Sequence, residues 1–575
     1  MRVRPLALAA VLAIGIASGL VVAAPATAAE TGAGAGAEAD VPTPVADIAI
    51  VMPLTVPLTD PAVAYSDPKL IPSGTPTLID AETLAYYTSP TGILTTELDA
   101  VHDSAVTIGI DPLIIASIRA LGSSAPDSAR AWLTRLSLAT NDTFALSWAD
   151  SDLTGPLQAG RRHVVRPTSL DFAIDPTLFS TASTASPDPD ATPDANSTEA
   201  PPLPSSDELT AWNYTLPSIA WPRADTVAAK DFATIAGAYD TTLLSSTNLT
   251  RTEVNSATAT LGSRPAVVTD APLSLLVSSA LTATDIDGWD SAVAAVTSSI
   301  TATAARAPAD QTASLVIALD REAQLPSSRL TATVAAIAAL PAARLVGLGG
   351  IAGASASPAA LIDERQSGTR LARMKTLLAE ESIDARFAAV AADPTLITGE
   401  RRIRLLNTLS PSAERQAGGW GAATSEYLTD STTLLQSVKL ERSSGLLLLG
   451  DSESIRPAVT NDLNQPVTVR IHVRSLSPNL KVVESTVDLT IEPNYQRKAS
   501  VPVQAISNGR ARLALSLGTV AGTDIGSTEI VPINVQAGWE GPFTLIGGIV
   551  VVLIFAAGIL RTVLRRRKAR ATSGG

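Results

Sequence analysis

Short apolar runs alternate with helical stretches between residues 45 and 355. The runs are rich in β-branched residues and bounded by Asp, Pro or Gly, which is typical of buried strands. Strands that alternate with helices indicate right-handed β-α-β units and a parallel sheet. Predicted strands lie at 45–56, 106–110, 144–148, 218–221, 241–245, 266–269, 314–319 and 344–348, and predicted helices at 80–99, 115–121, 128–139, 225–238, 291–305 and 330–340.

Roughly seven or eight such units fit a closed or nearly closed α/β barrel over residues 45–355. A doubly wound open sheet is the alternative. The barrel is also distantly similar to the barrels of polysaccharide deacetylases and glycoside hydrolases, an analogy at the level of the fold alone. Residues 175–207 interrupt the pattern with Pro, Ser, Thr and Asp, and this composition predicts a disordered surface insertion.

The pattern changes after residue 355. Residues 356–431 form a predicted helical linker, with helices at 358–379 and 382–391 and no strand before the 430s. Residues 432–537 are strand-rich: Val467, Val469, Ile471 and Val473 alternate with polar residues, and Asn508-Gly509 is a tight-turn signal. This pattern predicts an immunoglobulin-like β-sandwich. Its predicted strands lie at 437–441, 445–449, 455–461, 465–474, 482–491, 497–503, 511–516 and 529–535.

Both ends of the chain carry apolar segments. Residues 1–29 have two early Arg residues, an apolar run and small residues, the layout of a cleaved signal peptide. An uncleaved anchor is the alternative, and residues 30–44 are a predicted disordered linker. Residues 542–564 are predicted to span the membrane as a helix, and the basic tail at 565–575 marks the cytoplasmic side. We therefore expect a single-pass type I protein of the cell membrane with its bulk outside the cytoplasm.

Composition narrows the possible partners. The 575-residue chain contains no Cys, so packing without disulfides must stabilise it. Its formal net charge is -13 although the C-terminal tail is basic, so the remainder is more acidic still. This charge argues against nucleic acid or an anionic membrane surface as the ligand.

Aspartates follow many of the predicted strands. In an α/β barrel the reactive side chains lie just past the carboxyl ends of the strands. Two carboxylates there could act as acid and base on a glycosidic bond, and three could hold a hard cation. The alternative is that these residues are helix caps and turn residues. The candidates are Asp111, Asp150, Asp152, Asp225, Asp270 and Asp320.

Other catalytic chemistry lacks residues to support it. The three His residues, His102, His163 and His472, form no His-x-x-x-His pair, so no zinc site is predicted. There is no Gly-x-Ser-x-Gly elbow, and the Gly-rich segment at 347–353 lacks the Lys of a P-loop. We predict no metal and no cofactor.

Four aromatic residues could stack on sugar rings: Trp148, Trp212, Tyr214 and Trp221. Trp148 and Trp221 stand at strand ends beside Asp150 and Asp225, which would suit a glycan-binding rim. The alternative is that they fill the core.

Several stretches carry a resemblance to a known family. They are VTIGIDP at 106–112, residues 131–152, IAWP at 219–222, VTNDLNQPVTV at 459–469 and Ala-Gly-Trp at 537–539. In these stretches the chain resembles an actinobacterial family of envelope proteins with a domain of unknown function. The resemblance extends from about residue 45 to the tail. Genes of that family commonly lie beside the gene for the MurJ-type (MviN) lipid II flippase. The resemblance implies a role linked to the export of cell-wall precursors and no particular reaction.

Two functions follow as hypotheses. The first is a non-catalytic envelope protein that binds cell-wall glycan or scaffolds an inner-membrane protein such as a MurJ-type flippase. The second is a cell-wall glycan hydrolase or deacetylase-like enzyme that uses the rim aspartates. The lack of His and Cys chemistry, and of a clear Glu pair at the strand ends, favours the first.

Overall fold

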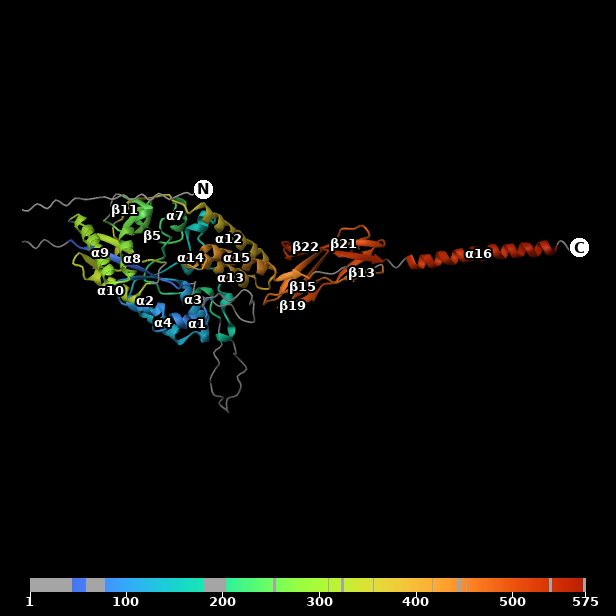
Figure 1. Ribbon diagram of the computed structural model, residues 1–575, viewed down its shortest axis with the longest axis horizontal. Coiled ribbons are helices and arrows are strands. Elements are labelled where there is room, and N and C mark those ends of the chain that lie inside the picture. Colours follow the sequence, from blue (N-terminus) through green and yellow to red (C-terminus); the bar gives the residue numbers. More distant parts are fainter. Residues whose placement is uncertain are drawn as a thin grey trace, which may run out of the picture. The chain divides into compact units, whose positions relative to one another are not determined.

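The computed structural model describes residues 44–57, 78–179 and 203–571, apart from 252–254, 309, 322–324, 355, 416, 442–445, 451 and 537–539. Figure 1 shows the helices and strands of the chain, coloured from the N-terminus to the C-terminus. The predicted signal peptide and nearly all of the linker that follows it lie outside the described residues, as do 180–202 of the predicted insertion and Trp539.

A five-stranded parallel sheet is built around the first strand, β1 (Ala46–Leu54). Every residue of β1 except Asp47 is buried, as expected of a strand covered on both faces. One edge of β1 pairs with β9 (Ala313–Ala318), and the other pairs first with β10 (Ala343–Leu345) and then with β2 (Thr107–Ile110). Beyond β2 lies β3 (Thr143–Ala145). The sequence located all five strands.

A second sheet has six strands. Three are parallel: β4 (Ile219–Ala220), β5 (Thr241–Ser245) and β8 (Arg264–Thr269). β7 (Thr258–Leu261) runs antiparallel to β8, and it is followed in the sheet by β11 (Ser357–Leu361) and β6 (Leu249–Arg251). Backbone hydrogen bonds join the sheets: among them Leu216 N donates to Thr143 O at 3.0 Å, and Asp270 N donates to Val316 O at 2.8 Å.

The sequence did not predict β6, β7 and β11. The expected helix at 358–379 is wrong in its first part, because residues up to Leu361 form strand β11 and the helix begins only at Gly368. The short segment Ser-Pro-Ala-Ala-Leu has no period-2 pattern of its own. Its conformation comes from pairing with β7 and β6, which lie far from it in the chain.

Helices cover the two sheets, and most of them match the expected positions. The helix expected at 80–99 is divided into α1 and α2, because Pro90 and Gly92 lie at the break and a Cβ on Gly92 would lie 2.2 Å from Tyr87 O. α8, with Asp270 as its N-cap, was not predicted. The helices are α1 (Ala81–Tyr87), α2 (Ile93–Val101), α3 (Pro112–Ala120), α4 (Asp127–Leu138), α5 (Thr154–Gln158), α7 (Ala229–Ile235), α8 (Ala271–Leu281), α9 (Ile286–Arg306), α10 (Ser327–Ala338) and α11 (Leu348–Ala352).

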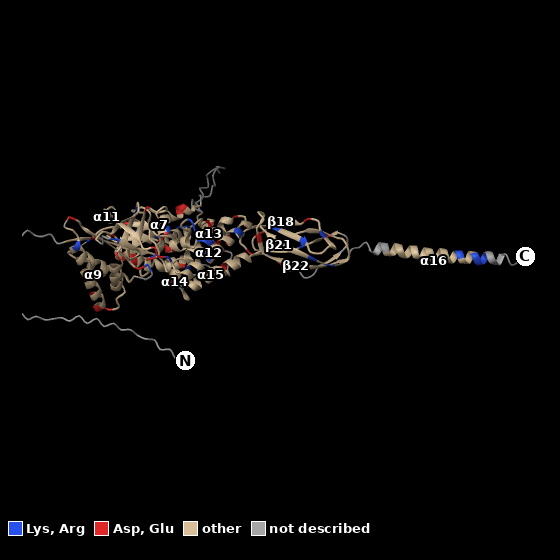
Figure 2. Cartoon of the chain, turned by 90° about the horizontal axis from the view of Figure 1, so that it is seen from above, with Lys and Arg blue, Asp and Glu red and all other residues tan. Residues whose placement is uncertain are grey.

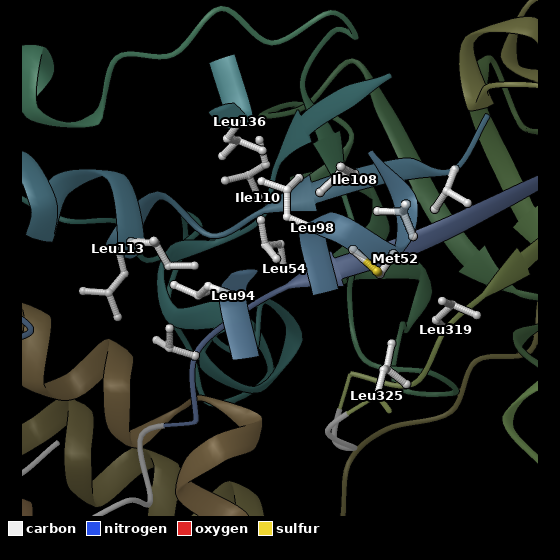
Figure 3. Packing of buried hydrophobic residues seen from close by; sticks show 14 of the residues in the cluster. Met52, Leu54, Leu94, Leu98, Ile108, Ile110, Leu113, Leu136, Leu319 and Leu325 are labelled. Atoms are coloured by element: carbon white, nitrogen blue, oxygen red, sulfur yellow. The ribbon is translucent and has the colours of Figure 1, made fainter. Parts of the chain in front are cut away.

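The main core of this α/β region lies between β1, β2 and the helices on one face. Figure 3 shows Met52 and Leu54 of β1, Ile108 of β2, and Leu94 and Leu98 of α2 among the packed side chains. Each of these side chains is fully buried. The core therefore fixes where the strands end, and with them the loops that carry the candidate site.

The borders of the predicted insertion at 175–207 are ordered, contrary to expectation. Asp175 caps a short 3-10 helix, η5 (Pro176–Leu178). Ser205 and Glu208 form a capping box at α6 (Ser206–Thr210), and Leu209 of this helix is fully buried. Arg119 Nη1 donates to Glu208 O at 3.0 Å and to Leu209 O at 3.2 Å. Composition alone missed this contact because it depends on an Arg that lies far away in the chain.

Four helices follow the α/β region: α12 (Gly368–Phe387), α13 (Pro394–Thr408), α14 (Pro411–Arg415) and α15 (Gly419–Leu435). Inside this group Arg401 Nε donates to the buried Asp384 carboxylate at 2.6 Å. The helices also contact the α/β region directly, since Asp152 N donates to Leu409 O at 3.0 Å.

The β-rich region that follows has three sheets around one core. Along β16 buried and partly exposed residues alternate as predicted, with Val467, Val469, Ile471 and Val473 inside. Its strands are β12 (Val438–Leu440), β13 (Leu446–Leu449), β14 (Ser452–Ile455), β15 (Ala458–Asn461), β16 (Val467–Ser475), β17 (Leu480–Val482), β18 (Thr486–Ile491), β19 (Tyr495–Lys498), β20 (Val501–Ala505), β21 (Gly509–Gly518) and β22 (Asp524–Gln536).

The last helix is α16 (Glu540–Ala571). Within residues 544–567 an 18-residue stretch has a mean hydropathy of 2.4 and is not buried by the rest of the chain. It is long and apolar enough to cross a membrane, in agreement with the predicted span at 542–564. In Figure 2 the blue of Lys and Arg residues is concentrated toward the C-terminal end of α16, and the sequence has Arg565, Arg566 and Arg567 there.

Candidate functional site

A cleft of about 370 Å³ lies at the carboxyl ends of β4, β5, β8 and β9. Ligand sites of α/β proteins usually form at this end of the strands, because the loops that follow parallel strands meet there. The lining comes from the loop after β4, the last residues of β5 and β8, one face of α8 and the loop after β9. It consists of Trp221, Pro222, Arg223, Ala224, Ser245, Thr269, Ala271, Ser274, Leu275, Ser278, Ala318, Leu319, Asp320, Arg321 and Pro411.

Asp150 is buried and ion-paired beside this cleft. Arg321 Nε donates to Asp150 Oδ2 at 2.8 Å, and Nη2 of the same guanidinium donates to Oδ1. Arg321 Nη1 donates to Pro222 O at 3.1 Å. Burial raises the pKa of Asp150, and the charge and hydrogen bonds of Arg321 offset only part of that effect.

The backbone around Asp150 is strained. Ala149 and Asp150 have φ angles of 52° and 51°, in the left-handed region that non-glycine residues rarely adopt. They belong to a 3-10 turn, η3 (Trp148–Asp150), that directly follows β3. Asp225, in the loop after β4, has a φ of 58°. Strain of this kind persists only where surrounding contacts fix the backbone, and it clusters at functional sites.

Asp152 is buried and hydrogen-bonded on both oxygens. Oδ1 accepts from the backbone N–H groups of Thr154 and Gly155, each at 2.9 Å. Oδ2 accepts from Gln366 Nε2 at 2.8 Å and lies 3.4 Å from Arg370 Nη2. Burial alone would raise the pKa of Asp152, but the hydrogen bond from Gly155 and the charge of Arg370 outweigh it and hold the pKa below its usual value.

Asp111 is the N-cap of α3. One of its oxygens accepts from Leu113 N and from Ala149 N, both at 2.9 Å, so it also holds the strained turn. Burial raises the pKa of Asp111 to about 8, although these two hydrogen bonds oppose the shift. The carboxyl is 1% exposed and is not part of the cleft wall.

The remaining aspartates hold different positions. Asp270 caps α8 by accepting from Leu273 N at 2.9 Å. Asp225 accepts a hydrogen bond from the Thr247 hydroxyl. Asp320 is exposed and lines the cleft. The structure therefore places Asp320 alone of these aspartates in the lining of the cleft and gives Asp111 and Asp270 the capping geometry that was the alternative interpretation.

Ion pairs connect this rim to the helices that follow. Arg223 forms a two-point pair with Glu414, with distances of 2.7 Å and 3.2 Å. Arg370 lies between Glu414, at 2.8 Å, and Asp152. Since α12 supplies Arg370 and α14 supplies Glu414, these pairs join the strand-end loops to the helical segment.

The two candidate Trp residues differ in their surroundings. Trp148 is 4% exposed and belongs to the main core rather than the cleft wall. Trp221 lines the cleft, but the Arg321 guanidinium lies 4.7 Å from its ring centroid and covers one face. Tyr214 and Trp212 pack against the main core. The arrangement leaves no broad aromatic face of Trp221 open for stacking on a sugar.

No group of three or more His, Asp or Glu side chains comes together as a metal site within the described part of the chain. His102 pairs with Asp103 at 2.9 Å, and His472 lies on β16 in the β-rich region. These positions give no support to a zinc-dependent reaction through the histidines.

Sequence reasoning missed the arginines and the serines of the cleft. Arg321 follows Asp320 directly after a predicted strand, so a rule that inspects every charged residue after a strand would have found it. Arg370 and Glu414 do not follow a predicted strand, because they lie beyond the predicted barrel. Ser274 and Ser278 lie on α8, the helix that was not predicted.

Comparisons with solved structures reach only a small part of the chain. An alpha-2-macroglobulin of E. coli is 17% identical over 17% of this chain and 6% of its own length, with a TM-score of 0.15. WR4, an MSP family member of C. elegans, is 9% identical over 17% of this chain and 98% of its own length, with a TM-score of 0.14. Similarities this weak support no assignment of fold or function.

No curated protein matches the chain. A family model does match, over residues 33–571, and its description is "Family of unknown function (DUF6049)". This match covers the α/β region, the helices, the β-rich region and α16.

Proposed function

The chain belongs to DUF6049, a family of unknown function, and we propose that it is a non-catalytic envelope protein anchored in the membrane. Its bulk lies outside the cytoplasm. There, as the resemblance to envelope proteins implies, it assists the export of peptidoglycan precursors, either by scaffolding an inner-membrane protein such as a MurJ-type flippase or by binding cell-wall glycan.

One observation carries the non-catalytic part of the proposal: Arg321 holds both oxygens of the Asp150 carboxylate. A glycoside hydrolase needs one carboxyl group that can give up a proton to the substrate and a second that can reach the sugar or a water. Asp150 is engaged in a buried ion pair, Asp152 is hydrogen-bonded on both oxygens, and Asp111 is enclosed. This leaves Asp320 as the candidate carboxylate on the cleft wall, whereas glycoside hydrolysis needs two carboxyl groups that act together.

A nearly closed barrel is the architecture that we propose for the α/β region. Parallel strands β1, β2, β3, β4, β5, β8 and β9 would follow one another around it. The hydrogen bond from Leu216 to Thr143 supports the step from β3 to β4, and the bond from Asp270 to Val316 supports the step from β8 to β9. In an open doubly wound sheet, one of these two pairs of neighbouring strands would have no hydrogen bond between them.

For the β-rich region and the termini we propose an immunoglobulin-like sandwich and a type I topology. The alternating burial of β16 and the single core shared by three sheets support the sandwich. The apolar length of α16 and the arginines that follow its span support the topology.

Turnover tests the proposed function. Full-length protein in detergent micelles is incubated with purified cell-wall glycan, and released sugars and free amines are measured. We expect no product above a protein-free control. Product formation by the wild type would show an enzyme instead, and its loss in Asp150→Asn at a temperature where the variant remains folded would assign the reaction to this carboxylate. Protease added to intact spheroplasts tests the topology, and it should remove everything except α16 and the tail.

A further inference from the structure

Both arginines of the cleft are already paired with carboxylates. Arg321 pairs with Asp150, and Arg223 pairs with Glu414. Asp320 adds a further carboxylate to the wall. An anionic ligand would have to separate an arginine from its partner, and a buried carboxylate that loses its partner is costly. The charge pattern therefore selects against anions and favours a ligand without formal charge.

Hydroxyl groups provide the hydrogen bonds of the cleft. Ser274 Oγ accepts from Ala318 N at 3.0 Å and keeps its own hydrogen to donate. The Ser278 side chain has no hydrogen-bond partner among the described residues. Thr269 donates to Leu244 O at 3.3 Å and keeps acceptor capacity. Asp320 brings carboxylate oxygens, which accept several hydrogen bonds. Such a mixture of donors and acceptors suits a ligand that carries many hydroxyl groups.

Apolar side chains complete the walls between these hydroxyls. Leu275 on α8 is 69% exposed and lines the cleft, so its side chain is accessible to a bound ligand. Leu319, Pro222 and Pro411 add further apolar surface. The C–H faces of a sugar ring can be buried against such surface while its hydroxyls reach the serines.

We infer that this cleft binds a neutral oligosaccharide, with Ser278, Ser274 and Asp320 contacting its hydroxyls and Leu275 covering a ring face. The inference rests on the proposed function, since it specifies the ligand of a non-catalytic protein. It moves the contact surface away from Trp148, which is in the core, and from the ring face of Trp221, which Arg321 covers. The volume lies within the range of sites that enclose small organic ligands.

Calorimetric titration tests the inference on full-length protein in detergent micelles. The probes are triacetylchitotriose as the neutral oligosaccharide, trigalacturonate as the anionic one, and inorganic phosphate. We expect saturable binding of triacetylchitotriose and none of the other two. Ser278→Ala and Leu275→Ala should each weaken binding about three- to tenfold, the loss of one contact. Leu138→Ala is the matched control, because Leu138 on α4 is 71% exposed and lies outside the cleft wall.

Ser278→Trp gives a second test, because a large ring at this partly exposed position would fill the cleft. It should abolish binding while the melting temperature stays near that of the wild type. Tighter binding of trigalacturonate or phosphate, absence of binding by every probe, or binding that both cleft variants leave unchanged would overturn the inference. Slow cleavage of bound triacetylchitotriose would contradict the proposed function and leave the binding site in place.

Discussion

The guanidinium group of Arg321 contacts both the Trp221 ring, at 4.7 Å from the centroid, and the Asp150 carboxylate, at 2.8 Å through Nε. One arginine from the loop after β9 thus joins the loops after β3 and β4. A cation placed over an aromatic ring and bound on two sides is held in one orientation.

Removal of the charge on Asp150 should therefore destabilise the fold. Asp150→Asn retains the left-handed backbone, which Asn tolerates, but leaves Arg321 buried without its counter-charge. We expect the free energy of unfolding to fall by about 3 kcal/mol in urea titrations of the full-length protein. The control is Asp127→Asn, whose carboxylate is 97% exposed in its pair with Arg130 and should matter little. Equal stability of the two variants would show that the Arg321 pair contributes nothing.

Glu97 on α2 should make stability depend on pH. Burial raises its pKa from 4.5 to about 8 in the folded protein. Between these values the folded state holds a proton that the unfolded state has released, so stability declines as the pH rises. One such group gives a slope of about 1.4 kcal/mol per pH unit.

The test is Glu97→Gln, which mimics the protonated side chain. The unfolding free energy is measured between pH 5 and pH 8 for both proteins. That of the variant should fall less steeply, with a slope smaller by about 1.4 kcal/mol per pH unit. A parallel pair of curves would mean that Glu97 is ionised in the folded protein.

Gly399 on α13 should not tolerate a side chain. A Cβ at this position would lie 2.7 Å from the backbone oxygen of Ser169, which cannot move aside as a flexible side chain can. Ala normally stabilises a helix relative to Gly, but here we expect Gly399→Ala to lower the melting temperature, with a cost of about 1–3 kcal/mol. Gly368→Ala on α12 is the control, since a Cβ there meets no atom within 4 Å.

Retention in the membrane should depend on the centre of α16. Leu553→Asp places a carboxylate in the middle of the apolar segment, which costs about 2.5–3.5 kcal/mol on insertion. We expect alkaline extraction of membranes to release much of this variant and almost none of the wild type. Val483→Asp in the β-rich region, 59% exposed, should behave as the wild type. Release of the wild type under the same conditions would contradict an integral membrane anchor.

The sequence allowed the central strands and the terminal helix to be predicted because their signals are local. The run of β-branched residues that includes Ile48, Ile50 and Val51 predicts a buried strand, and β1 is buried over almost its whole length. β11 could not be found in this way, because Pro358 and Ala359 pair with strands that were themselves unrecognised. Antiparallel additions to a parallel sheet depend on tertiary contacts more than on their own composition.

The sequence pointed to the carboxyl ends of the strands but did not reveal the partners of the side chains there. Of the predicted aspartates, Asp320 lines the cleft and Asp150 lies beside it, paired with Arg321. Whether Asp150 is free or paired depends on Arg321, which is more than a hundred residues away in the chain. Trp148 and Trp221 are likewise both buried in core clusters, and only the packing determines that Trp221 also lines the cleft.

The central place of β1 has a consequence for how the chain reaches its fold. Ala46 pairs with Ala313 on one side and with Ala343 on the other. At about 5–20 residues per second of synthesis, these partners emerge on the order of tens of seconds after β1. The second half of β1 can pair earlier with β2, but its Ala46 end keeps open edges until β9 and β10 are made. Such open apolar edges are exposed to aggregation, and closing these long loops carries a large entropy cost. We therefore expect the first sheet to be completed late, and a chaperone that shields the Ala46 end of β1 to raise the folding yield.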